Sequence, residues 1–416
     1  MPEIFRLFFS ITGEEPWLAR RRHLNRRQRT EPGVATILNT IYSRELAISS
    51  LILNKYHSFG YPSAYERPEL LGPYSFAATF VRIYQKLPGP ICKILVSRLL
   101  GDLKNKGLGS LALELETAAH LSRLGFDLQF HDLIRNSPGS FDFLATRDGL
   151  EVEIDCKAIS ADTGNPISAF GAAAIVSFAD DAIKKFRAVG RTIILEVIVS
   201  KKVSKRDNVA RSIAQAITNS LQEKSNFESE FSTVNYSSRD SKDVQSLQRQ
   251  STVQYPLLDG AFGEWDHIIV NPDEGQGGVI LLLRSTEKSN RVERITETLK
   301  ESVEKQFSGL RPVVLFVRLA DISGDIFIKF LGRRTFMNDV CDNLFSSTEK
   351  RPHIAGVIFL PGTPVVARST SDDFRVAGEQ SVSFFIRNEN HPISTDPIFS
   401  LLHPPADPNP GPLTAM

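Results

Sequence analysis

The fold is decided by residues 141–157, which read FDFLATRDGLEVEIDCK. An Asp-Gly pair between two alternating runs of β-branched and aromatic residues is the strongest short-range signal for a two-residue hairpin turn, because Asp148 and Gly149 tolerate positive φ. With these two residues as the turn, Arg147 pairs with Leu150. Counting outward then predicts an antiparallel hairpin in which Asp142 lies opposite Asp155.

The two faces of this hairpin differ, because side chains alternate along a strand. The apolar face is expected to pack on the core and consists of Phe141, Phe143, Ala145, Val152, Ile154 and Cys156. The polar face is expected to be open to solvent and carries Asp142, Glu153, Asp155 and Lys157. A slip of one residue would bury the acids, so the hydrophobic pattern itself favours this register.

The polar face has the residue types of a metal-dependent phosphodiesterase. Two carboxylates at facing positions repel each other unless a cation lies between them, and hard oxygen ligands select Mg²⁺ or Mn²⁺. Lys157 could then orient the attacking water and offset charge on the phosphate. The simpler alternative is an exposed sheet face with solvated charges, which is common on antiparallel strands.

A third acid lies in an apolar stripe. Residues 111–125 read as a helix that ends at Gly125, and Glu114 falls within the stripe formed by its leucines and alanines. A carboxylate buried there needs a partner or a metal. Glu116 is expected to project to the opposite side and to face water. The alternative is that Glu114 lies only at the margin of a wide stripe.

These residues together resemble the PD-(D/E)XK, restriction-endonuclease-like superfamily. The resemblance consists of a helix with an inward Glu, a strand at 126–130, Ser140-Phe141-Asp142, and Asp155-Cys156-Lys157. It implies an α/β fold with an αβββαβ core, in which a mixed central sheet is flanked by helices. It also implies catalytic roles for Glu114, Asp142, Asp155 and Lys157, with the three acids holding Mg²⁺ or Mn²⁺. The proline that often precedes the first acid is replaced by Phe141.

The end of that core is expected far downstream. Residues 294–307 have a helical pattern, and an apolar run at 312–317 follows them. The resemblance makes Lys305 and Gln306 candidates for contact with the substrate backbone, although such a pair is also common on a solvated helix surface. The alternative is that the nearer helix at 179–186 and strand at 192–199 take these places.

The domain organisation follows from these segments. Residues 1–104 are expected to form a mostly helical accessory domain, and 105–365 the nuclease-like domain with a large insertion around 160–290. Residues 224–255 are poor in periodicity and are expected to be a long loop. Residues 366–416 are a C-terminal extension, expected to be disordered from about 391 because prolines recur there.

Composition limits the function classes. The 416 residues carry a net charge of +1, so any nucleic-acid affinity must be local. The clearest basic segment is 20–29, with six arginines, which could contact phosphates or be a solvated arm. The three cysteines are not spaced as metal ligands are. The sequence has neither an apolar run of membrane length nor an export signal. We therefore expect a cytoplasmic protein without a membrane partner.

We therefore expect a cytoplasmic, Mg²⁺-dependent nuclease whose partner is nucleic acid, DNA rather than RNA. Because a fold does not determine function, two alternatives stay open. One is a catalytically inactive nucleic-acid-binding or assembly protein that keeps the same fold. The other is a nuclease effector toxin.

Overall fold

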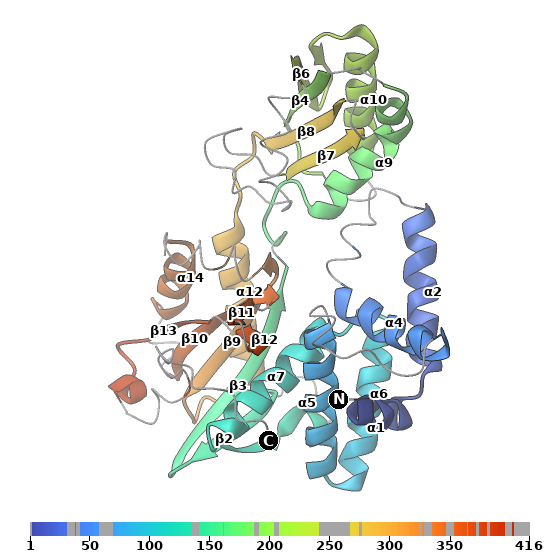
Figure 1. Cartoon of the computed structure of the whole chain (residues 1–416). Helices are drawn as coiled ribbons and strands as arrows, with labels where there is room; N and C mark the ends of the chain where they lie inside the picture. The colour runs from blue at the N-terminus through green and yellow to red at the C-terminus, as the bar shows by residue number, and fades with distance from the viewer. Residues whose placement is uncertain are drawn as a thin grey trace. The chain divides into compact units, whose positions relative to one another are not determined.

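The structure is a computed structural model of the whole chain (Figure 1). It describes residues 2–30, 42–57, 70–134, 141–186 without 161, 191–240 without 204–207, 267–323 without 274–276, 335–346, and 353–395 without 364, 372–373 and 381–382, together with residues 38, 327 and 402. These residues form a mixed α/β structure.

The chain divides into two compact units. Unit 1 consists of Met1–Arg20, Arg44–Ser160 and Ile295–Met416, and unit 2 consists of Arg21–Ser43 and Ala161–Arg294. All of the sequence-predicted site residues, from Glu114 to Gln306, belong to unit 1.

Unit 1 is built around a mixed six-stranded sheet in the order β1-β2-β3-β9-β10-β13. Its strands are β1 (Asp127–Phe130), β2 (Phe143–Arg147), β3 (Leu150–Ile159), β9 (Val313–Ser323), β10 (Ile354–Thr363) and β13 (Phe384–Arg387). The strands β1, β2 and β3 are antiparallel neighbours, and β3, β9 and β10 run parallel. A separate pair, β11 (Val365–Ser371) and β12 (Phe374–Gln380), forms a two-stranded sheet.

The predicted hairpin and its register are confirmed. β2 pairs with β3 so that Arg147 lies opposite Leu150 and Phe143 opposite Ile154. The turn residues Asp148 and Gly149 have φ angles of 50° and 84°, the positive values that a type I′ turn requires.

The expectation that the polar face is open to solvent was wrong. Glu153 is 0 % exposed and Asp155 is 1 % exposed. The helix α12 (Arg291–Gln306) covers this face, since its Ser302 and Gln306 contact Asp155 and Lys157. A strand whose two faces are both covered must satisfy its buried charges with partners: Glu153 accepts the backbone N–H of Ser308 at 3.0 Å, and Asp155 pairs with Lys157.

Helices from the N-terminal third pack on the same core. They are α1 (Pro2–Thr12), α2 (Glu15–Thr30), α4 (Ser43–His57), α5 (Leu71–Lys86), α6 (Gly89–Lys104) and α7 (Gly109–Arg123). One apolar cluster runs from Phe5 and Phe80 through Leu115 of α7 to Phe143 and Phe316 in the sheet. The boundary expected at residue 104 therefore does not separate two cores, because α7 is packed between the aromatic helices and the sheet.

Of the two expected helix–strand pairs, the downstream one lies beside the hairpin. β9 pairs in parallel with β3, with Val317 opposite Lys157, and α12 precedes β9 in the chain. The nearer helix and strand instead belong to α9 (Ala169–Lys185) and β4 (Arg191–Val199) of unit 2. The longer segment of unit 2, Ala161–Arg294, follows β3 in the chain and ends within the first turn of α12.

Unit 2 has its own five-stranded sheet in the order β5-β6-β4-β8-β7. Besides β4 and α9 it contains α10 (Asn208–Glu223), β5 (Phe227–Glu228), β6 (Ser232–Asp240), β7 (His267–Asp273) and β8 (Gly277–Ser285). The long loop expected at 224–255 is thus wrong for its first half, where β6 pairs with β4 along nine residues. Residues 241–255 lie outside the described residues.

The remaining elements of unit 1 are α8 (His131–Ile134), α14 (Thr335–Phe345) and the 3-10 helix η3 (Pro392–Thr395). The tail was expected to be disordered from about 391, but its first residues form η3. Leu402 is fully buried, and the other residues after 395 lie outside the described set. Among the helices of the described ranges, none has the length and apolar character needed to cross a membrane.

Candidate functional site

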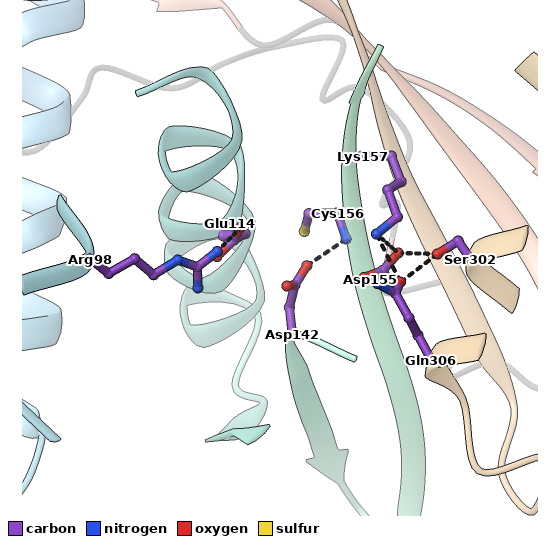
Figure 2. A network of polar contacts seen from close by, with 8 residues as sticks. All are labelled: Arg98, Glu114, Asp142, Asp155, Cys156, Lys157, Ser302 and Gln306. Carbon is purple, nitrogen blue, oxygen red and sulfur yellow. Dashed lines mark hydrogen bonds and ion pairs between the residues drawn. The ribbon is translucent and has the colours of Figure 1, made fainter. Parts of the chain in front are cut away.

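The four sequence-predicted site residues come from α7 and the β2-β3 hairpin (Figure 2). Glu114 lies in the middle of α7, Asp142 directly precedes β2, and Asp155 and Lys157 lie in β3. All three carboxylates lie near one residue of β3, Cys156. The pKa of that thiol is raised well above its usual value, first by burial and then by the negative charges of Asp142, Glu114 and Asp155.

Asp142 lies where the β2-β3 ladder ends. Its backbone N–H donates to Ile154 O at 3.1 Å, and its carboxylate Oδ2 accepts the backbone N–H of Cys156 at 2.6 Å. The side chain thus replaces the next strand hydrogen bond and is held at the edge of the ladder instead of on the polar face. The residue is 8 % exposed, so its carboxylate is nearly withdrawn from water.

Asp155 and Lys157 form a direct ion pair against α12. Lys157 Nζ lies 2.8 Å from Asp155 Oδ2, and it also donates to Gln306 Oε1 at 2.8 Å. Ser302 Oγ is 2.7 Å from Asp155 Oδ2 and 2.6 Å from Gln306 Oε1. Because a serine hydroxyl carries a single proton, Ser302 can donate to only one of these two acceptors at a time.

Glu114 is buried, as its place in the stripe predicted, and its partner is an arginine. Arg98 Nη2 of α6 lies 2.6 Å from Glu114 Oε1, and the glutamate side chain is 9 % exposed. Arg98 was missed by sequence reasoning, although a signal was present. It lies three residues after the buried Leu95 and one before the buried Leu99, so it is a charged residue on the apolar stripe of α6.

Glu116 is only partly exposed, 32 % for its side chain, and it is paired with two arginines, so the expectation of a glutamate that projects into water was wrong. Its carboxylate lies between Arg44 of α4, at 2.7 Å, and Arg318 of β9. Burial acts to raise the pKa of Glu116, but the two guanidinium groups outweigh it and hold the pKa below its usual value. Glu116 therefore belongs to a different set of charges from Glu114.

Lys305 and Gln306, the two candidates from α12, also differ in their contacts. Gln306 contacts Lys157 and Ser302, whereas Lys305 is exposed and pairs with Glu301 at 3.2 Å one turn away. Ser302, which reaches Asp155, was also missed. Its signal was a hydroxyl residue among the buried positions of α12, which are Ile295, Thr296, Leu299, Ser302 and Val303.

The donor set suits a hard cation, although it is not arranged as a closed cage. Within the described ranges, no three His, Cys, Asp or Glu side chains are grouped to hold a metal ion. Mg²⁺ usually needs only one or two protein carboxylates, with waters and substrate phosphate completing its shell. A carboxylate has about four acceptor sites, so Asp155 can keep Lys157 and Ser302 on Oδ2 and still offer Oδ1.

The basic segment at 20–29 lies in α2, and its residues from Arg21 onward are assigned to unit 2. Arg20 is buried, while Arg22, Arg26 and Arg29 are exposed and line one open hollow together with Asn25. The spacing of four and three residues places these three arginines on one face of the helix, where they present concentrated positive charge.

Comparison with known proteins yields no relative: no protein-family model, no curated protein and no solved structure matches this chain. The functional argument therefore rests on the chemistry of the site alone.

Proposed function

We propose that this protein is a metal-dependent nuclease with a restriction-endonuclease-like core, and that its substrate is DNA. The observation that carries the proposal is that Asp142, Glu114 and Asp155 all lie near Cys156 of β3, with Lys157 paired to Asp155. The element order supports it. With the short helix α8 and the elements of unit 2 set aside, α7, the antiparallel strands β1, β2 and β3, the helix α12 and the parallel strand β9 follow the αβββαβ order that the family resemblance implies.

In this proposal Asp142 and Asp155 hold Mg²⁺ or Mn²⁺, and Glu114 supports it directly or through water. Such an ion, when bound, polarises a phosphoryl oxygen and lowers the pKa of bound water. Lys157 is fixed by Asp155 and Gln306, so its ammonium group is oriented before substrate arrives. From that position it can hold the attacking water and offset negative charge that develops on the phosphate.

A non-catalytic nucleic-acid-binding or assembly protein is the second candidate. A specific observation favours it: two of the acids already have a basic partner within the protein, Arg98 for Glu114 and Lys157 for Asp155. A scaffold that had lost catalysis would need such pairs, because buried charges require partners. Against this candidate stands the presence of all three carboxylates together with the lysine.

Incubation with linear and circular DNA and with RNA, in Mg²⁺, Mn²⁺ or EDTA, tests the proposal. We expect cleavage that needs a divalent ion and that falls by roughly 100-fold or more in Lys157→Ala. Lys184→Ala is the matched control, since Lys184 is an exposed lysine of α9 in unit 2 that pairs with Asp180 on its own helix. Cleavage by Lys157→Ala at the rate of the control would refute the assignment. Binding without cleavage in every ion would favour the scaffold.

A further inference from the structure

A second site in unit 1 lies around Glu116. It is a cavity of about 630 Å³, bordered by α4, α5, α7, the middle of β9 and the second half of β10. Its volume is in the range of small-molecule sites, roughly 300–1,000 Å³.

The cavity carries an excess of positive charge. Arg44, Arg123 and Arg318 line it, against a single acid, Glu116, among its described lining residues. Glu116 lies between Arg44 and Arg318 and can neutralise only one of these two guanidinium groups. A buried cation without a full counter-charge is costly, so the site favours an added anion.

Arg318 gives a second, independent indication. It is 9 % exposed and lines the cavity, and its Nε is buried without a hydrogen-bond partner among the described residues. A guanidinium group has a planar fork of donors that matches phosphate or carboxylate oxygens in pairs. Glu116 uses one nitrogen of Arg318, Nη2, so this guanidinium group, which lines the cavity, has donor capacity that Glu116 does not satisfy.

Part of the wall is apolar. Phe316 and Ile358 are 3 % and 1 % exposed, and Leu360 lies next to them on the same border of the cavity. A bare inorganic anion would leave this surface in contact with water. A ligand with a flat, weakly polar ring attached to a phosphate would use both the arginines and the apolar wall.

We propose that this cavity binds a nucleoside phosphate, with the phosphate held by Arg318 and Arg44 and the nucleoside against Phe316 and Ile358. Arg123, which is exposed, lies at the rim, where it can attract the anion. The site is distinct from the acid and lysine residues assigned to DNA cleavage, so occupation of one is measurable without the other.

The test is calorimetric titration of the full chain in EDTA with each of the four ribonucleoside 5′-monophosphates, with adenosine and with inorganic phosphate. We expect at least one nucleotide to bind, and adenosine and phosphate to bind at least about tenfold more weakly. Arg318→Gln and Arg44→Gln should each weaken nucleotide binding by about 10- to 100-fold, the value of a charge-assisted hydrogen bond. Arg211→Gln is the control, because Arg211 is an exposed arginine of unit 2 that lies over Phe178.

Glu116→Gln should change nucleotide affinity in the opposite direction from the arginine variants, and this test does not depend on how well those variants fold. It removes the acid that competes for both guanidinium groups, so the nucleotide should bind several-fold more tightly, and a damaged cavity could not produce that gain. The proposal is overturned if no nucleotide binds, if Glu116→Gln weakens binding, or if inorganic phosphate binds as tightly as every nucleotide. Binding of a 5′-phosphorylated oligonucleotide in the absence of nucleotide binding would also overturn it.

Discussion

The ion pair between Lys157 and Asp155 permits a stability test that does not depend on activity. Asp155 is 1 % exposed and the Lys157 side chain 23 %, so removing the lysine leaves a buried carboxylate with Ser302 as its remaining described side-chain donor. Breaking a buried pair by removing one partner costs about 3–5 kcal/mol. Because Lys157 is partly solvated, we expect Lys157→Ala to cost about 3 kcal/mol of unfolding free energy.

The double variant Lys157→Ala with Asp155→Asn distinguishes this cause from lost packing. Asparagine removes the uncompensated charge and keeps the shape, so the double variant should be more stable than Lys157→Ala alone, by about 1–2 kcal/mol. The exposed pair of Lys305 and Glu301 is the control, and Lys305→Ala should change stability by at most about 0.5 kcal/mol.

Urea unfolding followed by tryptophan fluorescence measures these differences in unit 1. The chain has two tryptophans, Trp17 and Trp265. Trp17 is fully buried in the unit 1 core, so a Trp265→Phe background makes the signal specific to that unit. A shift in the midpoint urea concentration, with the slope of the free energy against urea unchanged, reports the change in stability. The ion pair is not energetically coupled if the stability costs of Lys157→Ala and Asp155→Asn simply add in the double variant. A double variant no more stable than Lys157→Ala would also refute the pair and its burial under α12.

Three further predictions concern metal, charge and pH. Mg²⁺ or Mn²⁺ should raise the melting temperature of the wild type and not that of Asp142→Asn with Asp155→Asn, and equal shifts would place the metal elsewhere. Glu114→Gln should slow cleavage at saturating Mg²⁺ by roughly 10- to 100-fold, whereas Glu301→Gln, an exposed glutamate of α12, should match the wild type; equal rates for the two variants would remove Glu114 from the site. The raised pKa of the Cys156 thiol means that the folded protein keeps this proton to higher pH than the unfolded chain does. The stability that this thiol contributes is therefore fully present below about pH 8.5, and above that pH it is lost by up to about 1.4 kcal/mol per pH unit. The free energy of unfolding of Cys156→Ala should therefore fall less steeply than that of the wild type between about pH 7.5 and 9.5. An unchanged dependence would contradict the burial of this thiol among three acids.

The part of the site that could be predicted is the part that local rules determine. The Asp148-Gly149 turn sets the register within four residues, and the alternation then places every other side chain of the hairpin. The same holds for Glu114, whose burial follows from helix periodicity. These features need no knowledge of the rest of the chain.

The partners of these residues could not be predicted, because they come from distant segments. Ser302 lies 147 positions from Asp155, and Gln306 lies 149 positions from Lys157. The expectation of a solvent-facing hairpin failed for the same reason, since nothing between 141 and 157 signals that α12 covers it. Glu116 was misplaced because α7 is buried on more than one side, between helices and sheet, so it has no fully solvated face.

The two ion pairs also bear on how the proposed nuclease would respond to metal. A cluster of three buried acids repels itself, and in the absence of a divalent ion the arginine and lysine supply the missing positive charge. Arg98 is placed on Glu114 Oε1, and Lys157 is placed on Asp155 Oδ2, so each acid has a second oxygen that a divalent ion could use. The positive charges of Arg98 and Lys157 would nevertheless repel an incoming ion. An active site and an inert scaffold therefore differ in whether a divalent ion binds beside these two pairs, and Glu114 with Arg98 is one place where the difference would be measured.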